Sequence, residues 1–158
     1  NGWFRGESTI QSQEREDTIE VVEFDHDLTS PLSGEAMDAG HDPPLGIRQH
    51  RPVRVIARID SATPLMIRAW ATNEVCEVFF RFFRPDPAGS GAEVEYYKVQ
   101  LTGAMVVRAK THFPNALRTE TASLPEVIEY QFTYHDIIWT YLDGQIEYQD
   151  QWLDRPTS

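Results

Sequence analysis

The residues best suited to chemistry are histidines flanked by carboxylates. Asp25, His26 and Asp27 follow one another, and a carboxylate beside an imidazole is the usual arrangement of a general base and the group that orients it. On a strand, however, adjacent side chains point to opposite faces, so neither aspartate is placed to hold the imidazole. We therefore interpret His26 as a half-exposed strand residue without a catalytic role.

The histidines also lack the spacing of a metal site. No two of the five lie four residues apart as on a helix, or two apart as on a strand, so a site would have to be assembled by tertiary contacts alone. We expect solvated side chains, with no metal and no cofactor. The histidines concerned are His26, His41, His50, His112 and His135.

The single cysteine, Cys76, cannot form an internal disulfide, which excludes a disulfide scaffold and the common four-ligand structural zinc sites based on two or more cysteines. With His112 or His135 it could form a nucleophile and base, but it lies between Val75 and Glu77 in an apolar segment, which favours a buried, inert thiol. The sequence has neither a glycine-rich phosphate loop nor a Gly-x-Ser-x-Gly motif. The protein is predicted not to be an enzyme.

The elements that position these residues are mainly β-strands, because apolar residues alternate at a period of two. Val53, Val55 and Ala57 point one way, with Arg54 between them. The segment 75–83 is apolar on both faces and is predicted to be a central strand. Further strands are expected at 18–28, with a bulge near Val21, and at 93–102, 103–109, 127–134, 137–142 and 145–149.

Two chain reversals and one helix complete the predicted fold. Asp143-Gly144 predicts a type I′ hairpin turn, and the prolines and glycines of 85–91 predict a second reversal. The helix is expected within 61–73, with Thr63 as its cap and Pro64 at the first helical position. Its predicted buried stripe consists of Leu65, Met66, Ala69 and Trp70.

Composition limits the partners. The 158 residues carry a formal net charge of −11 and no compact basic cluster, which disfavours nucleic acid and anionic lipid. The apolar runs fall far short of the roughly 20 residues that cross a bilayer, so we expect no membrane insertion. The sequence begins at Asn1 without the pattern of a signal peptide, and we expect further residues to precede it.

The order of six short motifs resembles the haemolysin-coregulated protein (Hcp) family, the tube protein of the bacterial type VI secretion system. The similarity spans nearly all of the chain, although Thr63 stands where the family has serine. The motifs are Gly6-Glu7-Ser8 followed by 19–26; Gly46, Arg48, His50 and Pro52 as G-x-R-x-H-x-P; Asp60 with Thr63-Pro64-Leu65; Tyr96, Tyr97, Val99 and Leu101; Ile137 and Trp139; and Trp152.

The resemblance implies one β-barrel domain over residues 1–158, built from two packed sheets with one flanking helix. Six copies would form an open ring, and rings would stack into a tube that carries a spike, lies inside a contractile sheath and leaves the cell with effectors. The protein would reside in the bacterial cytoplasm before firing and then be secreted without a signal peptide. The family's first apolar strand is expected before Asn1; without it, one barrel edge would be left unpaired.

The segment 29–49 is too long for an economical connection between strands. Its prolines restrict the unfolded chain, so ordering it against a neighbour costs less entropy than ordering a glycine-serine loop. We predict an arm that contacts the next ring of a stack. The candidate contact residues are Pro31, Leu32, Met37, Pro43, Pro44, Leu45, Gly46 and Ile47.

A second hypothesis comes from a different class of protein. The chain could be a small acidic ligand-binding barrel or enzyme, with a site built from Tyr96, His112, Tyr134 and His135. A concave ligand site favours a monomer or dimer, whereas the tube requires a ring. The mass in solution separates the two hypotheses.

Overall fold

The computed structural model describes residues 4–10, 14–30 and 48–152. These residues form a mainly β structure with one helix, as predicted. The elements are β1 (Val21–Asp25), β2 (Leu28–Thr29), β3 (Gln49–His50), β4 (Val53–Arg58), α1 (Thr63–Ala71), β5 (Cys76–Pro85), β6 (Glu93–His112), β7 (Val127–Thr133), β8 (Asp136–Tyr141) and β9 (Ile146–Gln151).

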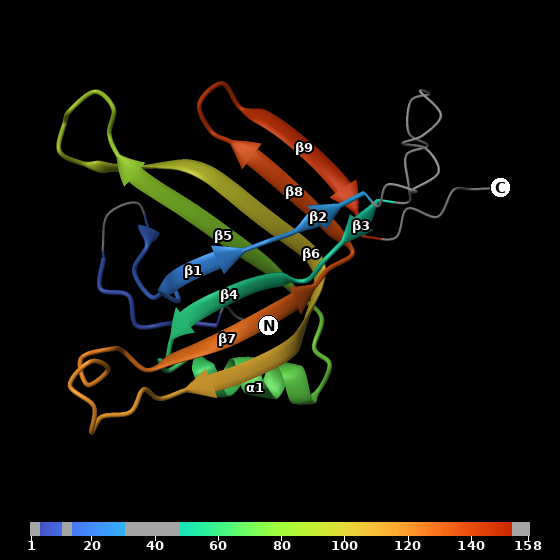
Figure 1. Ribbon diagram of the computed structural model, residues 1–158. Coiled ribbons are helices and arrows are strands. Elements are labelled where there is room, and N and C mark those ends of the chain that lie inside the picture. The colour runs from blue at the N-terminus through green and yellow to red at the C-terminus, as the bar shows by residue number, and fades with distance from the viewer. Residues whose placement is uncertain (1–3, 11–13, 31–47, 153–158) are drawn as a thin grey trace, which may run out of the picture.

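The long strand β6 belongs to two layers of a curled sheet (Figure 1). Its first half pairs with β5 on one side and with β8 on the other, and β9 continues that layer beyond β8. Its second half pairs with β7, which is followed by β4 and β1. All of these pairings are antiparallel. The curled sheet confirms the predicted two-layer β architecture.

Gly103 marks the point where β6 passes from one layer to the other. Up to Thr102 the strand pairs with β8, and from Met105 onward it pairs with β7. Gly103 has a φ of +60°, and a Cβ atom there would lie 2.8 Å from the Cβ of His135. Only glycine adopts this backbone without strain or collision. The two strands expected at 93–102 and 103–109 are therefore one strand with a bend.

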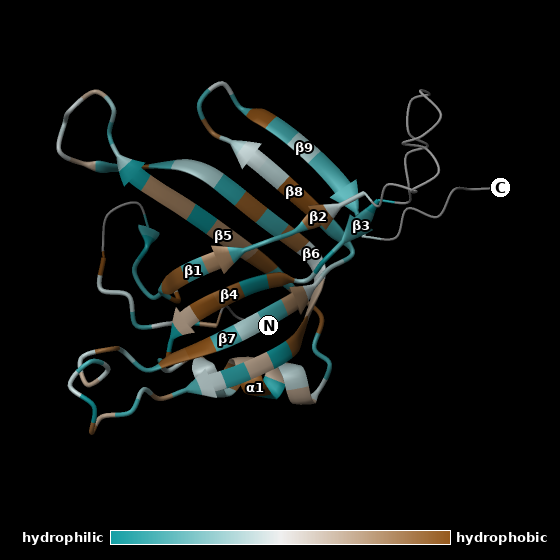
Figure 2. Cartoon of the chain, in the orientation of Figure 1, coloured by the Kyte–Doolittle hydropathy of each residue, from teal (hydrophilic) through white to brown (hydrophobic). Residues whose placement is uncertain are grey.

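The core lies between the two layers. The predicted inward positions of β4, Val53, Val55 and Ala57, are at most 2% exposed, and they lie opposite Phe132, Tyr130 and Ile128 of β7. The layers also meet through aromatic rings, since Phe24 of β1 packs edge-on against Phe80 and Phe82 of β5. Figure 2 shows the resulting bands of hydrophobic and hydrophilic residues along the strands.

Helix α1 packs beneath the second half of β6 (Figure 1). Thr63, Met66 and Ala69 form its buried face, whereas Trp70 is 49% exposed, so the predicted stripe was wrong at Trp70. The predicted cap was also wrong. The helix follows Ala62, whose amide donates to Asp60 Oδ1, and Thr63 Oγ1 accepts from the amide of Asp60. Among the described residues, no helix is long and apolar enough to span a membrane.

Three strand predictions need correction. Strand β5 pairs only with β6 within the described residues, so it is an edge strand and not a central one, and Phe79 and Phe83 on its second face are half-buried. The strand expected at 18–28 is shorter, because the chain leaves β1 at Asp25, although the predicted bulge appears between Val21 and Glu23. The β8–β9 hairpin is present, but its positive φ angles fall on Gly144 and Gln145, one residue later than predicted.

Candidate functional site

A short two-stranded stem brings distant parts of the chain together. Strand β2 pairs with β3, with Leu28 opposite His50 and Thr29 opposite Gln49. The amide of Arg51 donates to the carbonyl of Asp27 at 3.2 Å and extends the pairing beyond the two strands. The chain therefore leaves this point after β2 and returns to it before β3.

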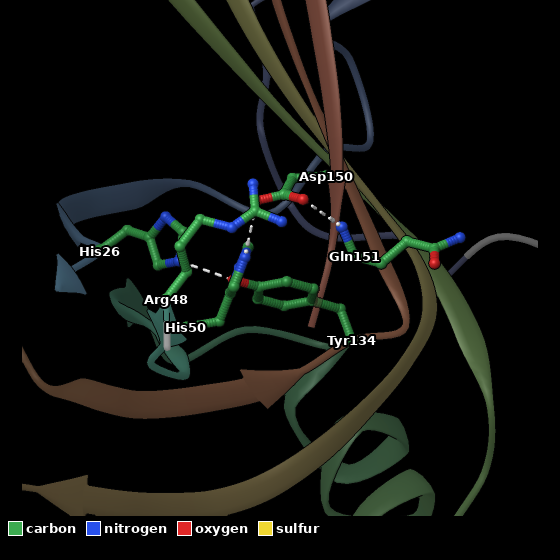
Figure 3. Close-up of polar contacts among 6 residues, drawn as sticks. All are labelled: His26, Arg48, His50, Tyr134, Asp150 and Gln151. Atoms are coloured by element: carbon green, nitrogen blue, oxygen red, sulfur yellow. Dashed lines mark hydrogen bonds and ion pairs between the residues drawn. The ribbon is translucent and has the colours of Figure 1, made fainter. Parts of the chain in front are cut away.

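A partly buried polar cluster joins this stem to the rest of the fold (Figure 3). The hydroxyl of Tyr134 lies 2.9 Å from His26 Nε2 and 2.8 Å from His50 Nδ1. On the far side of the His50 ring, Nε2 lies 3.0 Å from Asp150 Oδ2, and Arg48 pairs with the same carboxylate oxygen at 3.3 Å. We call these five residues the Tyr134 cluster.

The five members of the Tyr134 cluster come from four places in the fold. His26 follows β1 and His50 lies on β3 beside Arg48, whereas Tyr134 joins β7 to β8 and Asp150 lies on β9. The cluster thus fixes the stem to both layers of the sheet.

Aromatic rings enclose the Tyr134 cluster. Trp152 packs edge-on against Tyr134, with the ring centroids 4.9 Å apart, and its ring also lies beside His50. Trp139 stacks on His26 at 6.3 Å. As a result Tyr134 is only 5% exposed and the side chain of His50 only 3%. Directional hydrogen bonds in such an environment are stronger than in water, and an unsatisfied group is more costly.

Burial shifts the pKa of two members of the cluster, His26 and Tyr134. Burial lowers the pKa of His26 below its ordinary value, and the neighbouring His50 lowers it further. Burial also raises the pKa of Tyr134, with the charge of Asp150 acting in the same direction. The tyrosine therefore keeps its hydroxyl hydrogen, and the closed cluster favours a neutral His26.

The order Asp150, His50, Tyr134 is that of an orienting carboxylate, a base and a hydroxyl. A tyrosine nucleophile requires the phenolate, which its raised pKa disfavours, and both ring nitrogens that face the hydroxyl are already engaged by it. Within the described residues, no group of three or more histidine, cysteine, aspartate or glutamate side chains is arranged to hold a metal ion. The arrangement is suited to holding chain segments together.

The alternative ligand site is not assembled. Tyr96 and His112 lie near opposite ends of β6, sixteen residues apart, while Tyr134 and His135 lie beside the Gly103 bend between them. At about 3.3 Å per residue, such a separation is far too long for one pocket. His112 is exposed. The exposed His135 bonds Asp136 at 2.8 Å. Tyr96 packs against Tyr141 and beneath Arg84.

The histidine predictions were partly wrong. The side chain of His50 is buried, and His26 is half-buried with its ring in the cluster, so neither side chain is simply solvated. Sequence periodicity missed them because their hydrogen-bond partners, Tyr134 in the connection after β7 and Asp150 on β9, lie far away in the chain. The one signal in the sequence was the G-x-R-x-H-x-P motif, which contains both Arg48 and His50. Cys76 is free and half-buried, and burial raises the pKa of its thiol, as expected for a packing residue.

The predicted arm residues all lie outside the described part of the chain. They are Pro31, Leu32, Met37, Pro43, Pro44, Leu45, Gly46 and Ile47. The described structure reaches Ser30 on one side of this segment and resumes at Arg48 on the other.

The curled two-layer sheet places the chain in the class of two-layer β-proteins, and the Tyr134 cluster ties distant segments of that sheet together. The family model for "Type VI secretion system effector, Hcp" matches residues 1–141. The chain belongs to this Hcp family.

Individual relatives agree with this assignment. The chain is 28% identical over 138 residues to the "Major exported protein" of Pseudomonas aeruginosa, covering 87% of this chain and 76% of the relative. It is similar to a mutant Hcp1 protein from the E. coli EAEC 042 pathovar, with a TM-score of 0.76 and 26% identity, covering 95% of this chain and 90% of that one. The fold is also that of the secreted protein Hcp3 from Pseudomonas aeruginosa, with a TM-score of 0.68 and 22% identity, covering 96% and 87% of the two chains.

Family membership confirms the predicted function. The chain is a structural tube component of type VI secretion and not an enzyme. Proteins of this family assemble with themselves into rings and tubes. The family description and the name of the Pseudomonas relative indicate an exported protein.

Proposed function

We propose that six copies of this chain form a closed ring and that segment 31–47 carries the contact between stacked rings. The observation that supports the stacking role is the β2–β3 stem. Because Thr29 lies opposite Gln49, the two ends of the segment are held side by side. A short turn would connect β2 to β3 equally well. The additional length of the segment is therefore available to contact a neighbouring ring.

The composition of segment 31–47 supports the same role. Its apolar residues are separated by small and polar ones, so they cannot form a core alone but can bury a modest apolar area against another surface. Three prolines reduce the entropy lost on docking. We infer that the apolar contacts come from Leu32, Met37, Leu45 and Ile47.

The ring is tested by its mass in solution. Six chains of 18.2 kDa give about 109 kDa, and a heterologous interface that closes on itself stops at a fixed size. Light scattering at micromolar concentration is expected to give this mass. A stable monomer or dimer would contradict the ring.

Ring closure and ring stacking should differ in their dependence on salt concentration. A ring carries a formal charge of 6 × −11 = −66, and repulsion between exposed charges is screened at high ionic strength. Raising the salt concentration should therefore lengthen stacks more than it changes the mass of a single ring. A stack length that is independent of salt would contradict an electrostatic barrier to stacking.

The stacking role is tested by electron microscopy. Replacing 31–47 with a two-residue Asn-Gly turn should leave rings intact and abolish tubes and secretion. A milder variant, L32S with L45S, should shorten tubes, whereas A36S with A39S, which places two hydroxyls in the same segment, should not. Normal tubes from the shortened chain would overturn the stacking role, and loss of rings would assign the segment to the lateral interface.

We further propose that the stacked rings carry a spike at one end, lie within a contractile sheath and transport effectors, and that the chain resides in the cytoplasm before it is exported. The family assignment supports this order of events. Co-purification of sheath or spike protein with tubes, but not with single rings of the shortened chain, is the expected result. Equal recovery of sheath or spike protein with tubes and with single rings would contradict the proposal that these partners bind only the stacked form.

A further inference from the structure

The Tyr134 hydroxyl lies between two histidines, and its capacity for hydrogen bonds is limited. A tyrosine hydroxyl offers one hydrogen and two lone pairs. His26 Nε2 and His50 Nδ1 lie 2.9 Å and 2.8 Å from this oxygen. On the other side of His50, the carboxylate of Asp150 can only accept, so His50 Nε2 carries a hydrogen.

The cluster is fully satisfied with one added proton, and without that proton one of its hydrogen bonds is not made. When both rings are neutral, His50 Nδ1 accepts the hydrogen of Tyr134, and His26 can donate either from Nε2 to the tyrosine oxygen or from its other nitrogen to the backbone of Arg51, but not to both. When His50 binds a proton at Nδ1, it donates to the tyrosine oxygen instead, and the hydroxyl turns its hydrogen toward an unprotonated His26 Nε2. Both arrangements use the same positions of the heavy atoms.

A second proton breaks this pattern. If both histidines are charged, both donate to the oxygen of Tyr134, and the hydroxyl hydrogen has no acceptor within the cluster. Two positive rings then face each other across one buried oxygen. An unsatisfied group and an uncompensated charge in a buried site are each costly.

The surrounding charges neutralise one positive ring better than two. Asp150, which contacts His50, already shares its carboxylate with Arg48. Asp27 acts on His26 but is itself paired with Arg51. Within the described residues, the charged groups recorded against the two rings are Asp25, Asp27 and Asp150, with Arg48 paired to Asp150 and Arg51 paired to Asp27.

We propose that the Tyr134 cluster is a proton-operated latch, which stays closed with one added proton and opens when the second proton binds. Opening separates the β2–β3 stem, with His26 and His50, from Tyr134 and from Asp150 on β9. In the tube, opening would release the base of segment 31–47 and so detach rings at acidic pH. This last consequence rests on the proposed stacking role, whereas the latch itself does not.

The latch is tested by hydrogen exchange of the purified protein at pH 7.5 and pH 5.0, expressed as protection factors. If only the open form binds the second proton, protection in peptides containing residues 28–30 and 48–51 falls tenfold per pH unit below about 6.5, or about 30-fold at pH 5.0. Peptides from β4 should keep their protection. Unchanged stem protection at pH 5.0 would overturn the proposal.

His26→Gln isolates the second proton. A glutamine amide can donate to or accept from the tyrosine hydroxyl but cannot bind a proton, so the variant should keep its stem protection at pH 5.0 within about twofold of its value at pH 7.5. His112→Gln is the matched control, because His112 is exposed and outside the cluster, and it should open like the parent. Opening of His26→Gln to the same extent as the parent would contradict the latch.

Nitrogen chemical shifts of the imidazole rings test the same proposal without a substitution. In the parent protein, loss of stem protection should coincide with the second histidine protonation and not with the first. Two charged rings in a protected stem would contradict the latch. If the stem opens at pH 5.0 while tubes persist, the latch stands and the stacking role of segment 31–47 falls.

Discussion

Two tyrosines on one face, in the middle of β7 and just beyond its end, are buried to a similar degree in opposite surroundings. Tyr130 is 2% exposed between Ile128 and Phe132, in the apolar core. Tyr134 is 5% exposed and lies just beyond the strand, on the same face by period, but its hydroxyl is bonded to two histidines. Around Tyr130 the face is stabilised by apolar burial, which is independent of pH. Around Tyr134 it is stabilised by hydrogen bonds between titratable groups, and their contribution depends on pH.

The largest effect is expected in the apolar core around Tyr130. Phe132→Ala should lower the free energy of unfolding by about 3–5 kcal/mol, because it leaves a cavity between β7, β4 and β5. Phe113→Ala is the matched control, since Phe113 is 65% exposed, and it should change stability by less than about 0.5 kcal/mol. Urea unfolding measures both. Equal effects would mean that the core is not where the structure places it.

Loss of the Tyr134 hydroxyl oxygen alone should lower the free energy of unfolding. Tyr134→Phe should cost about 1–3 kcal/mol, because it leaves two buried ring nitrogens without their partner. Tyr130→Phe should cost less, about 0.5–1.5 kcal/mol, because Thr63, the partner of that hydroxyl, keeps its bond to the Asp60 amide. Tyr148→Phe, at a 60% exposed position, is the control without an expected effect. A Tyr130 substitution more costly than that of Tyr134 would reverse the comparison.

The two regions should also differ in their dependence on pH. Burial and the neighbouring His50 lower the pKa of His26 below 6.5, so the unfolded chain binds the proton first and stability falls as the pH decreases through 6.5. Burial pushes the pKa of Glu129 upward, but Arg54 and Arg108 outweigh it and hold the pKa below 4.5. The stability that this carboxylate contributes is present above pH 4.5 and is lost below it.

Unfolding free energies between pH 8 and pH 3 should therefore decline in two steps. His26→Gln should remove the upper step alone, and Glu129→Gln should weaken the lower one. Arg54 and Arg108 lie on β4 and β6, beside Glu129, so the lower step belongs to the sheet and not to the stem. A single transition that neither variant changes would contradict the assignment of these groups.

The smallest effect is expected at Cys76, which belongs to neither region. Its half-buried thiol contacts the carbonyl of Ala104 at 3.5 Å and packs against the core. Cys76→Ala should cost roughly 1 kcal/mol, the centre of the range for single substitutions, and should leave secretion intact. Loss of secretion from a folded variant that still forms rings would show a role beyond packing.

Local sequence rules predicted the elements that short-range physics controls. The alternation of Val53, Val55 and Ala57 indicated a strand with one buried face because a strand alternates its faces regardless of what covers them. Pro64 indicated the start of the helix, and Asp143-Gly144 a hairpin. The helix cap was missed because several nearby side-chain oxygens could accept from the first helical amides. The turn residues were missed because more than one pair of positions can adopt positive φ angles. In both cases only the folded backbone selects among the candidates.

The alternation of apolar residues through Ile128, Tyr130, Phe132 and Tyr134 is a local property, and from it the sequence alone predicted a strand at 127–134. It could not establish what each residue would meet. Gly103 bends β6 between the two layers, and the β2–β3 stem folds back beside β9. Only these long-range pairings bring His26, His50 and Asp150 to Tyr134, because hydrogen-bond partners more than eighty residues apart leave no periodic trace in the chain.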